Sequence, residues 1–235
     1  MMRLTGYILV AAICLPTIAL ANNIGSVAEQ QGNGGIERGR DLVGSGIGTE
    51  IQSMDAAVTT NGTMRIDFID DTRVDITQHS KLIIDEFVYD PANNIGSVSL
   101  KASLGTVRYA SGQIAKRYQQ NVKIRTPSAT IGVRGTDFVM VVDEIGGSLI
   151  TLLPSCDSSG ACYTGEITVE TDAGFVVMNQ AFQATATTTS AQPPTPPKLL
   201  DLPEDMINSL LIIRKKVPYI EDEEEYKRAK RQAAD

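Results

Sequence analysis

The chain is poor in the residues that enzymes use most often. It has one histidine, His79, and no tryptophan. Histidine is the commonest general base near neutral pH, so a single copy leaves little scope for a nucleophile and base working together. His79 follows an expected strand, where a surface or turn role is the simpler interpretation. No glycine-rich phosphate loop opens an expected helix either. The sequence therefore predicts a protein that is not an enzyme and that needs no cofactor.

Positive charge and long apolar runs are also scarce. Lysine and arginine number 21 against 28 aspartates and glutamates, which gives a formal net charge of −7. Surfaces that bind nucleic acid are basic because they neutralise phosphates, so no nucleic-acid partner is expected. Beyond residue 20 no apolar run approaches the roughly 20 residues that cross a bilayer, so no transmembrane segment is expected in the mature chain.

The one long apolar run covers residues 7–20, follows Arg3, and ends in Ala-Leu-Ala at residues 19–21, which suits signal peptidase. Because the run is shorter than a membrane span, a cleaved signal peptide over residues 1–21 is expected rather than an anchor. The mature chain would begin at Asn22 with a charge of −8, since the leader removes one base and no acid. The expected location is the periplasm or outside a bacterial cell.

Cysteine is rare as well. Of three cysteines, Cys14 lies in the expected leader. Cys156 and Cys162 are separated by five residues of loop composition and should form a disulfide in an oxidising compartment. Two thiols and one remote histidine do not supply the four ligands of a zinc site, and the spacing is not that of a redox-active pair. The pair is therefore expected to be a structural disulfide.

Between residues 51 and 186 the sequence consists of short apolar stretches separated by turn signals. Residues 64–68, Met-Arg-Ile-Asp-Phe, alternate with the period of a half-buried strand, and pairs such as Asn61-Gly62 mark turns. Strands are expected at residues 73–76, 82–88, 98–104, 138–142, 148–153, 166–170 and 175–178, with one short helix around residues 111–120. After a lead-in segment at residues 22–43, the sequence predicts an all-β domain over residues 44–186, built as a two-sheet sandwich of short strands or a solenoid-like roll.

The carboxyl-terminal part has a different composition. Residues 187–200 are rich in proline and threonine, which is typical of a semi-extended linker. In residues 201–235, a charged amphipathic helical tail is expected, with Met206, Leu210 and Ile213 on one stripe. This stripe predicts either docking on another envelope protein or folding back over a sheet edge of the same chain.

Four aspartates gather near one expected turn. They are Asp67, Asp70, Asp71 and Asp75. Carboxylate oxygens are the ligands that calcium prefers, but these acids flank a hairpin and lack the spacing that gathers oxygens around one ion. A solvated turn is the favoured interpretation, and no metal site is assigned.

The most distinctive stretch is residues 126–138, Thr-Pro-Ser-Ala-Thr-Ile-Gly-Val-Arg-Gly-Thr-Asp-Phe, where two glycines bracket an arginine between β-forming residues. Here the chain resembles the FecR-domain family. Other segments similar to the family are residues 68–72, 85–91, 111–115 and 121–125, although the family usually has glycine where Asp71 stands. The resemblance covers roughly residues 44–186.

The resemblance implies an exported β domain. The best-known family members sit in the inner membrane and relay an iron-siderophore signal to a sigma factor, using a cytoplasmic segment and a membrane helix before the β domain. This sequence instead opens with an apparent cleavable leader, and it is similar to the short exported members built on a lone β domain. Direct sigma-factor control is therefore not expected.

The motif residues that the resemblance singles out carry either a structural or a binding role. They are Thr126, Pro127, Ala129, Gly132, Arg134, Gly135 and Thr136. A guanidinium between two glycines can cross-link strands by donating to carbonyls or a carboxylate, and this structural role is favoured for Arg134, at a contribution of about 1 to 3 kcal/mol. The glycines are expected to serve backbone geometry that a side chain would obstruct.

Three classes of function are compatible with these features. A binding or scaffold module of the bacterial envelope, whose partner is another envelope protein or a glycan, is favoured. A periplasmic sensory component that acts through a membrane partner is the alternative. An envelope glycan hydrolase is less favoured, because it needs two carboxylates about 5 to 10 Å apart across a cleft and no pair of acids has a distinctive context. The oligomeric state is not predicted.

Overall fold

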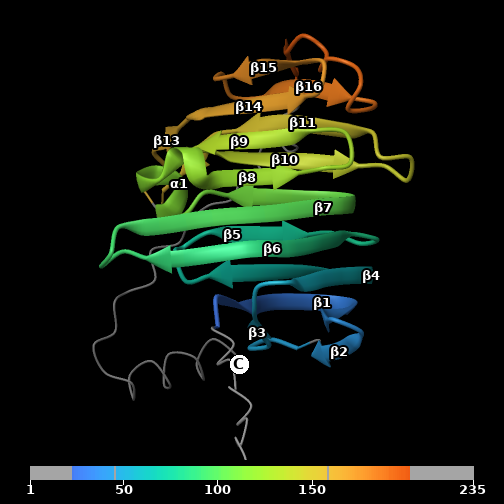
Figure 1. The fold of residues 1–235 in the computed structure, drawn as a ribbon, viewed down its shortest axis with the longest axis vertical. Helices are drawn as coiled ribbons and strands as arrows, with labels where there is room; N and C mark the ends of the chain where they lie inside the picture. The colour runs from blue at the N-terminus through green and yellow to red at the C-terminus, as the bar shows by residue number, and fades with distance from the viewer. Residues whose placement is uncertain (1–22, 45, 158, 202–235) are drawn as a thin grey trace, which may run out of the picture.

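The structure is a computed structural model, which describes residues 23–44, 46–157 and 159–201. Over these residues the regular structure is β-strand apart from one short α-helix and one 3-10 turn, so the all-β prediction is confirmed (Figure 1). The expected leader at residues 1–21 and nearly all of the expected helical tail at residues 201–235 lie outside the described residues.

The strands follow one another through the whole described chain. They are β1 (Gly25–Arg38), β2 (Asp41–Gly44), β3 (Glu50–Ile51), β4 (Asp55–Phe68), β5 (Arg73–Ile76), β6 (Lys81–Asp90), β7 (Ile95–Ala110), β8 (Val122–Arg125), β9 (Thr130–Arg134), β10 (Asp137–Val142), β11 (Ser148–Leu153), β12 (Ser155–Cys156), β13 (Cys162–Tyr163), β14 (Glu166–Thr171), β15 (Gly174–Met178), β16 (Gln183–Thr187) and β17 (Lys198–Leu199). Helix α1 (Gln113–Arg117) falls inside the expected helical region, and the 3-10 helix η1 (Gln119–Asn121) ends one residue beyond it.

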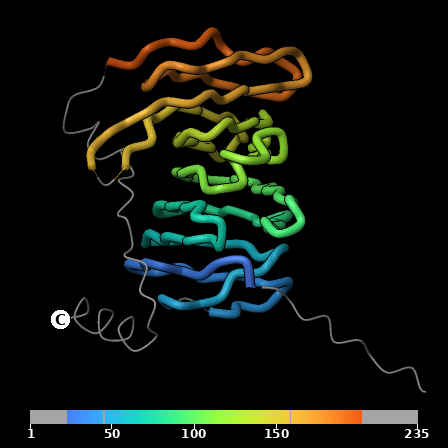
Figure 2. The backbone as a smooth tube through the Cα atoms, turned by 90° about the vertical axis from the view of Figure 1, so that its left-hand side faces the viewer, coloured from blue at the N-terminus to red at the C-terminus, as the bar shows by residue number. Residues whose placement is uncertain are grey.

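Fifteen of these strands form one sheet that folds over itself into two layers. Layer A runs from β6 through the first part of β7 to β8, β9, β14 and β15, and layer B runs from β5 through the last part of β7 to β10, β11, β16 and β17. The strands stack along the long axis, with β1 near one end and β15 and β16 near the other (Figure 1), and Figure 2 shows the chain rising between these ends as a flattened coil. The architecture therefore combines the two packed layers of a sandwich with the stacking of a solenoid-like roll.

Long strands carry the chain from one layer to the other. Strand β7 pairs with β6 as far as Leu104, and from Gly105 onward it pairs with β10. Gly105 has a φ of +83°, and a Cβ there would lie 2.1 Å from Oγ of Ser80. Only glycine avoids both the left-handed strain and this clash, so Gly105 sets the bend that separates the layers.

Alternating apolar residues fill the space between the layers. In β6, Leu82, Ile84 and Phe87 are buried, and the ring of Phe87 stacks on that of Phe68 from β4 with their centroids 4.8 Å apart. A bulge between Ile84 and Glu86 inserts one residue into β6, which leaves both acids at this point directed away from the core. Each fully buried Leu, Ile or Phe stabilises the fold by roughly 1.5–3 kcal/mol, so the shared core holds the two layers together.

The structure corrects the expectation of a solvated aspartate turn. Asp70 is only 1% exposed. Its Oδ1 accepts the backbone N–H of Thr72 at 2.9 Å, and its Oδ2 accepts the N–H of Ile114, in the first turn of α1, at 3.0 Å. Asp67 and Asp75 instead form ion pairs with arginines of neighbouring strands. Asp70 therefore fixes helix α1 to the turn between β4 and β5, and no group of three or more potential metal ligands occurs in the described part of the chain.

The strands extend beyond both expected domain boundaries. The lead-in segment at residues 22–43 contains β1, which pairs with β4 along nearly its whole length. Residues 187–200, expected as a free linker, lie along β16: the N–H of Thr195 donates to the carbonyl of Ala186 at 2.9 Å, and the carbonyl of Thr195 accepts Oγ1 of Thr185 at 2.6 Å. Proline and threonine suit an edge segment of this kind, because proline has no N–H to donate.

Cys156 and Cys162 form the expected disulfide in the structure. They face each other across the two-stranded hairpin of β12 and β13. The loop between them is closed by Asp157, whose Oδ1 accepts N–H groups from Ser159 at 2.8 Å and Ala161 at 3.0 Å. The disulfide and the aspartate thus hold the same local loop.

Candidate functional site

The outer face of layer A carries a row of polar positions that runs across its strands. The register aligns Glu86 of β6 with Ser99 of β7, Ser99 with Lys123 of β8, Lys123 with Gly132 of β9, and Gly132 with Thr168 of β14. Because side chains alternate along each strand, apolar neighbours such as Leu100, Ile124 and Ile131 face the core instead. The fold therefore gathers polar groups from segments that are far apart in the sequence.

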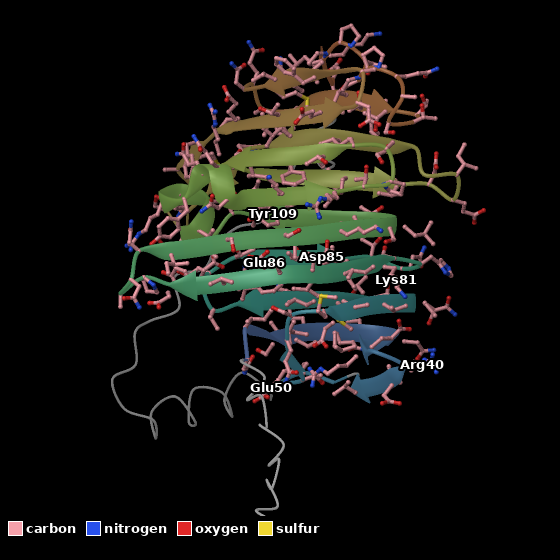
Figure 3. The ribbon with its side chains drawn as sticks, viewed as in Figure 1. Arg40, Glu50, Lys81, Asp85, Glu86 and Tyr109 are labelled. Carbon is pink, nitrogen blue, oxygen red and sulfur yellow. A yellow bond between two sulfur atoms is a disulfide. The ribbon has the colours of Figure 1, made fainter. Side chains whose placement is uncertain are left out.

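Two hollows occupy this face, and we call them together the groove. The larger, of about 520 Å³, is lined mainly by Asp85, Glu86, Ser97, Ser99, Lys123 and Arg125. The smaller, of about 170 Å³, is lined mainly by Gln119, Thr130, Gly132, Arg134, Thr168 and Glu170. Gln120 and Lys123 line both hollows. Figure 3 labels Asp85 and Glu86 on β6, which is the first of the strands that line the groove.

The charges of the groove are only partly paired. Nη1 of Arg125 lies 3.5 Å from Oδ2 of Asp85, and Oγ of Ser97 donates to Oε1 of Glu86 at 2.6 Å. Lys123 and Glu170, by contrast, form no ion pair with any residue that the structure describes. The centre of the groove thus offers an uncompensated ammonium group, and the β14 side offers an uncompensated carboxylate.

The start of the family motif is a buried hydroxyl network that joins the layers. Oγ1 of Thr126 accepts the N–H of Ala129 at 3.1 Å and Oγ of Ser148 at 2.9 Å. Oγ of Ser128 lies 2.7 Å from Oγ1 of Thr187, a residue of β16 in layer B. These contacts fix the turn between β8 and β9, so Thr126 and Ala129 have structural positions.

Two more motif residues also have structural positions. Pro127 lies against the turn between β10 and β11, where a Cβ on Gly146 would be 3.0 Å from Cβ of Pro127. Thr136 is fully buried and donates from Oγ1 to the carbonyl of Leu153 at 3.0 Å. Together with the hydroxyl network, these contacts anchor the segment on both sides of β9.

Arg134, Gly132 and Gly135 have different roles in the structure. The Arg134 side chain is 57% exposed and its Nη1 lies 2.9 Å from Oε1 of Glu166, the residue opposite on β14. Gly135 has a φ of +61°, which favours glycine. Gly132 lies outside the left-handed region, and a Cβ there would meet no atom within 4 Å. The expectation that both glycines avoid an obstruction is therefore wrong for Gly132.

Only part of the groove could be identified from the sequence. Gly132 and Arg134 were candidate site residues, whereas Lys123 and Glu170 were not. The signal that was available is the alternation of Lys123 and Arg125 with buried Val122 and Ile124 in β8, which puts both cations on one face. Which acids face them depends on the pairing of β8 with β7 and β9, which one strand alone does not determine.

The remaining sequence candidates lie elsewhere. His79 has a φ of +54° in the turn between β5 and β6, and its N–H donates to the carbonyl of Thr60. No helix within the described ranges is long and apolar enough to cross a membrane. Met206, Leu210 and Ile213 lie outside the described residues, so their docking role stays a prediction.

Most of the strands that build the groove lie in a region that matches a known family. Residues 55–153 match the family model described as FecR protein. These residues are similar to a FecR domain. The matched region runs from β4 to β11 and includes β6, β7, β8 and β9 of the groove, whereas β14 follows it. The resemblance read from the motif at residues 126–138 is thereby confirmed.

Solved structures that are similar to the chain are distant from it in sequence. Two crystal structures of a "putative anti-sigma factor" from Parabacteroides distasonis ATCC 8503 are similar to the chain, at 13% and 14% sequence identity with TM-scores of 0.45 and 0.44. In each case 61% of this chain is covered, and this chain spans 58% of the other. No curated protein matches the sequence.

Proposed function

We propose that the protein is a non-enzymatic binding module of the bacterial envelope, built on its FecR domain, and that the groove on layer A recognises a partner. The observation that carries this proposal is the groove itself: polar and charged side chains from β6, β7, β8, β9 and β14 converge on one open face. The core-facing residues of the same strands are apolar and closely packed, so these outward residues are free to serve recognition.

Binding suits the chemistry of the groove better than catalysis does. Its acids are spread along the rim, and two of them, Asp85 and Glu86, already accept a contact from Arg125 and Ser97. The chain's one histidine lies at a turn outside both hollows. The groove offers hydrogen-bonding groups and two uncompensated charges. These groups select the partner and determine its orientation in the groove.

A sensory role through a membrane partner is the second candidate, and the FecR match at residues 55–153 favours it. In this case too the groove would contact the partner. A strain that carries a groove variant would then change transcription of the genes that the partner controls. A pure scaffold would leave transcription unchanged while losing the partner.

Capture from an envelope extract tests the proposal when groove and control variants are compared. The groove variant combines Lys123→Gln with Arg125→Gln. The control combines Arg73→Gln with Lys81→Gln, which removes the same charge from two residues that pair with Asp67 and Glu37 outside the groove. We expect the control to retain the partner and the groove variant to lose about tenfold in capture. Equal capture by both variants, each with an unchanged circular dichroism spectrum, would contradict the proposal.

A further inference from the structure

The residues that the structure describes around Gly132 do not require glycine at this position. It lies within β9 and is paired with Lys123 on one side and Thr168 on the other. Its φ is outside the left-handed region and an added Cβ would meet nothing within 4 Å. A glycine inside a strand weakens that strand, and it often marks a place where a ligand approaches the backbone closely. The open space over Gly132 is part of the smaller hollow of the groove.

A cation that pairs with none of the described residues lies directly beside this space. Lys123 is the cross-strand neighbour of Gly132, and it forms no ion pair with the described residues. Arg134 lines the same hollow, but Glu166 already neutralises it at 2.9 Å. In a chain with a net charge of −7, an unpaired lysine at the centre of a hollow is a specific complement to a negative group.

The dimensions of the groove favour an extended ligand over a small ion. It crosses five strands, from β6 to β14. At about 4.8 Å between neighbouring strands, this is roughly 19 Å, the length of about six residues of extended peptide. Hydroxyls and amides, from Ser99, Thr130, Thr168 and Gln120, line the path on which a peptide backbone could be hydrogen-bonded.

We infer that the groove binds an extended peptide segment of a partner protein and places one acidic side chain over Gly132, where Lys123 pairs with its carboxylate. This inference rests on the proposed function and names the chemistry of its ligand. Three acids of the groove limit how many acidic residues the bound peptide can carry, because they would repel a run of acidic residues. They are Asp85, Glu86 and Glu170. A single acid flanked by small polar residues is therefore the complement.

A peptide suits the groove better than an acidic glycan. No aromatic side chain lines either hollow, so there is no ring on which the apolar face of a sugar could pack. Amide and hydroxyl groups on both sides of an open glycine instead match the alternating donors and acceptors of a peptide backbone.

Amide chemical shifts of the isotope-labelled mature protein test the inference. The probe is a blocked peptide with one central glutamate between serine and glycine residues, and its counterpart has glutamine in place of glutamate. We expect the glutamate peptide to shift the amides of Lys123, Gly132 and Thr168, and to bind about threefold to tenfold more tightly than the glutamine peptide. Raising the salt concentration should reduce this difference.

Two substitutions, each with a matched control, separate a binding role from a structural one. Lys123→Gln should abolish the preference for glutamate, whereas Lys81→Gln, which removes the same charge from a lysine paired with Glu37, should preserve it. Gly132→Val fills the hollow and should weaken binding about tenfold while the melting temperature stays unchanged or rises. Ser103→Val adds the same side chain to β7 at a position that lines neither hollow, and it should bind as the unchanged protein does.

Three results would overturn the inference. They are equal binding of the two peptides, full binding by Gly132→Val, and displacement of the peptide by an oligogalacturonate whose own binding depends on Lys123. If none of the peptide probes binds but capture of the natural partner still depends on Lys123 and Arg125, the proposed function stands and only the ligand class assigned to the groove is wrong.

Discussion

Individual side chains in this protein have effects that follow from burial more than from their charge. Asp70 and Asp71 are adjacent acids, yet the first is 1% exposed and accepts two backbone N–H groups, while the second is exposed. A buried acceptor that satisfies backbone donors is costly to lose, since the donors stay desolvated without a partner. Of these two adjacent aspartates, Asp70 is therefore expected to be important for stability and Asp71 dispensable.

Substituting Asp70 measures this difference. Asp70→Asn places an amide group where Oδ1 or Oδ2 now accepts an N–H from Thr72 or Ile114, so we expect it to lower the free energy of unfolding by about 1 to 3 kcal/mol. Asp71→Asn is the matched control and should change it by less than about 0.5 kcal/mol, because asparagine tolerates the φ of +66° at this position. Urea denaturation gives both values. Equal losses in the two variants would show that Asp70 is not a buried anchor.

Arg134 shows the opposite case, a motif residue whose side chain is mostly exposed. The sequence suggested a contribution of about 1 to 3 kcal/mol, but a single ion pair with Glu166 at 57% exposure contributes less. We expect Arg134→Ala to lower the free energy of unfolding by about 0.2 to 1 kcal/mol, and high salt to remove most of the effect. Thermal melts at low and high salt provide the measurement. A loss of several kcal/mol would mean that Arg134 holds more than this one pair.

The loop between the cysteines responds to pH through Asp157. Hydrogen bonds from the hydroxyl and N–H of Ser159, and from the N–H of Ala161, hold the pKa of this carboxyl below its usual range. Because the pKa is depressed in the folded loop, its contribution is complete above the ordinary aspartate pKa of about 3.9 and is lost as the pH falls through the folded value. The protection factor of the Ala161 amide, which is the intrinsic exchange rate at each pH divided by the observed rate, should be constant at pH 5 to 7 and fall below about pH 4. A protection factor that stays constant below pH 4 would contradict the assignment.

At the scale of elements, the long bent strands explain why the layers stay together. Arg65 of β4 hydrogen-bonds Asp75 of β5 at 2.6 Å and also pairs with Glu29 of β1, and Arg108 of β7 lies opposite Asp75. Burial tends to lower the pKa of Arg65, but the hydrogen bond to Asp75 and the nearby acids outweigh it and raise the pKa. This ladder of alternating charges runs from β1 through β4 and β5 to the last part of β7, whereas the groove lies on layer A.

The segment after β16 determines where the chain can be truncated to test the docking role of the tail. Because Thr195 and β17 pair with β16, a cut after Gln192 removes part of the sheet along with the tail. A chain ending at Asp201 retains these contacts. We expect it to melt at the same temperature as the mature protein if Met206, Leu210 and Ile213 dock on another protein, and at a lower temperature if they cover the β domain. Ending the chain at Gln192 should lower the melting temperature in either case, which provides the control.

Much of this organisation could be read from the sequence, because strand alternation and turn residues are local signals. The strands at residues 73–76 and 148–153 were placed with the bounds that the structure has, and the strand expected at 138–142 begins one residue earlier, at Asp137. What could not be read depends on contacts between distant segments. The burial of Asp70 requires helix α1 to lie over its turn, and the open space at Gly132 requires knowing that β8 and β14 flank β9.

In the whole molecule the strands stack along one axis and pair with their neighbours along its length. One of the two layers has an open polar outer face. The disulfide and the predicted cleavage can be tested together, because both are expected of an exported protein. The intact mass of protein purified from the periplasm should correspond to a chain that begins at Asn22, and it should rise on reduction by the mass of two hydrogens as the Cys156–Cys162 bond opens. A mass that includes residues 1–21, or no change on reduction, would count against export to an oxidising compartment.

The central claim is that layer A, and not layer B, is the recognition surface, and site-specific photo-crosslinking in living cells tests it most directly. A photoreactive amino acid is placed at Ser99 or Thr168, which line the groove, or at Val141 or Leu149, which are exposed on layer B. We expect a discrete crosslinked product from the two groove positions and none from the two layer B positions. Products of equal yield from both layers, or from layer B alone, would contradict it.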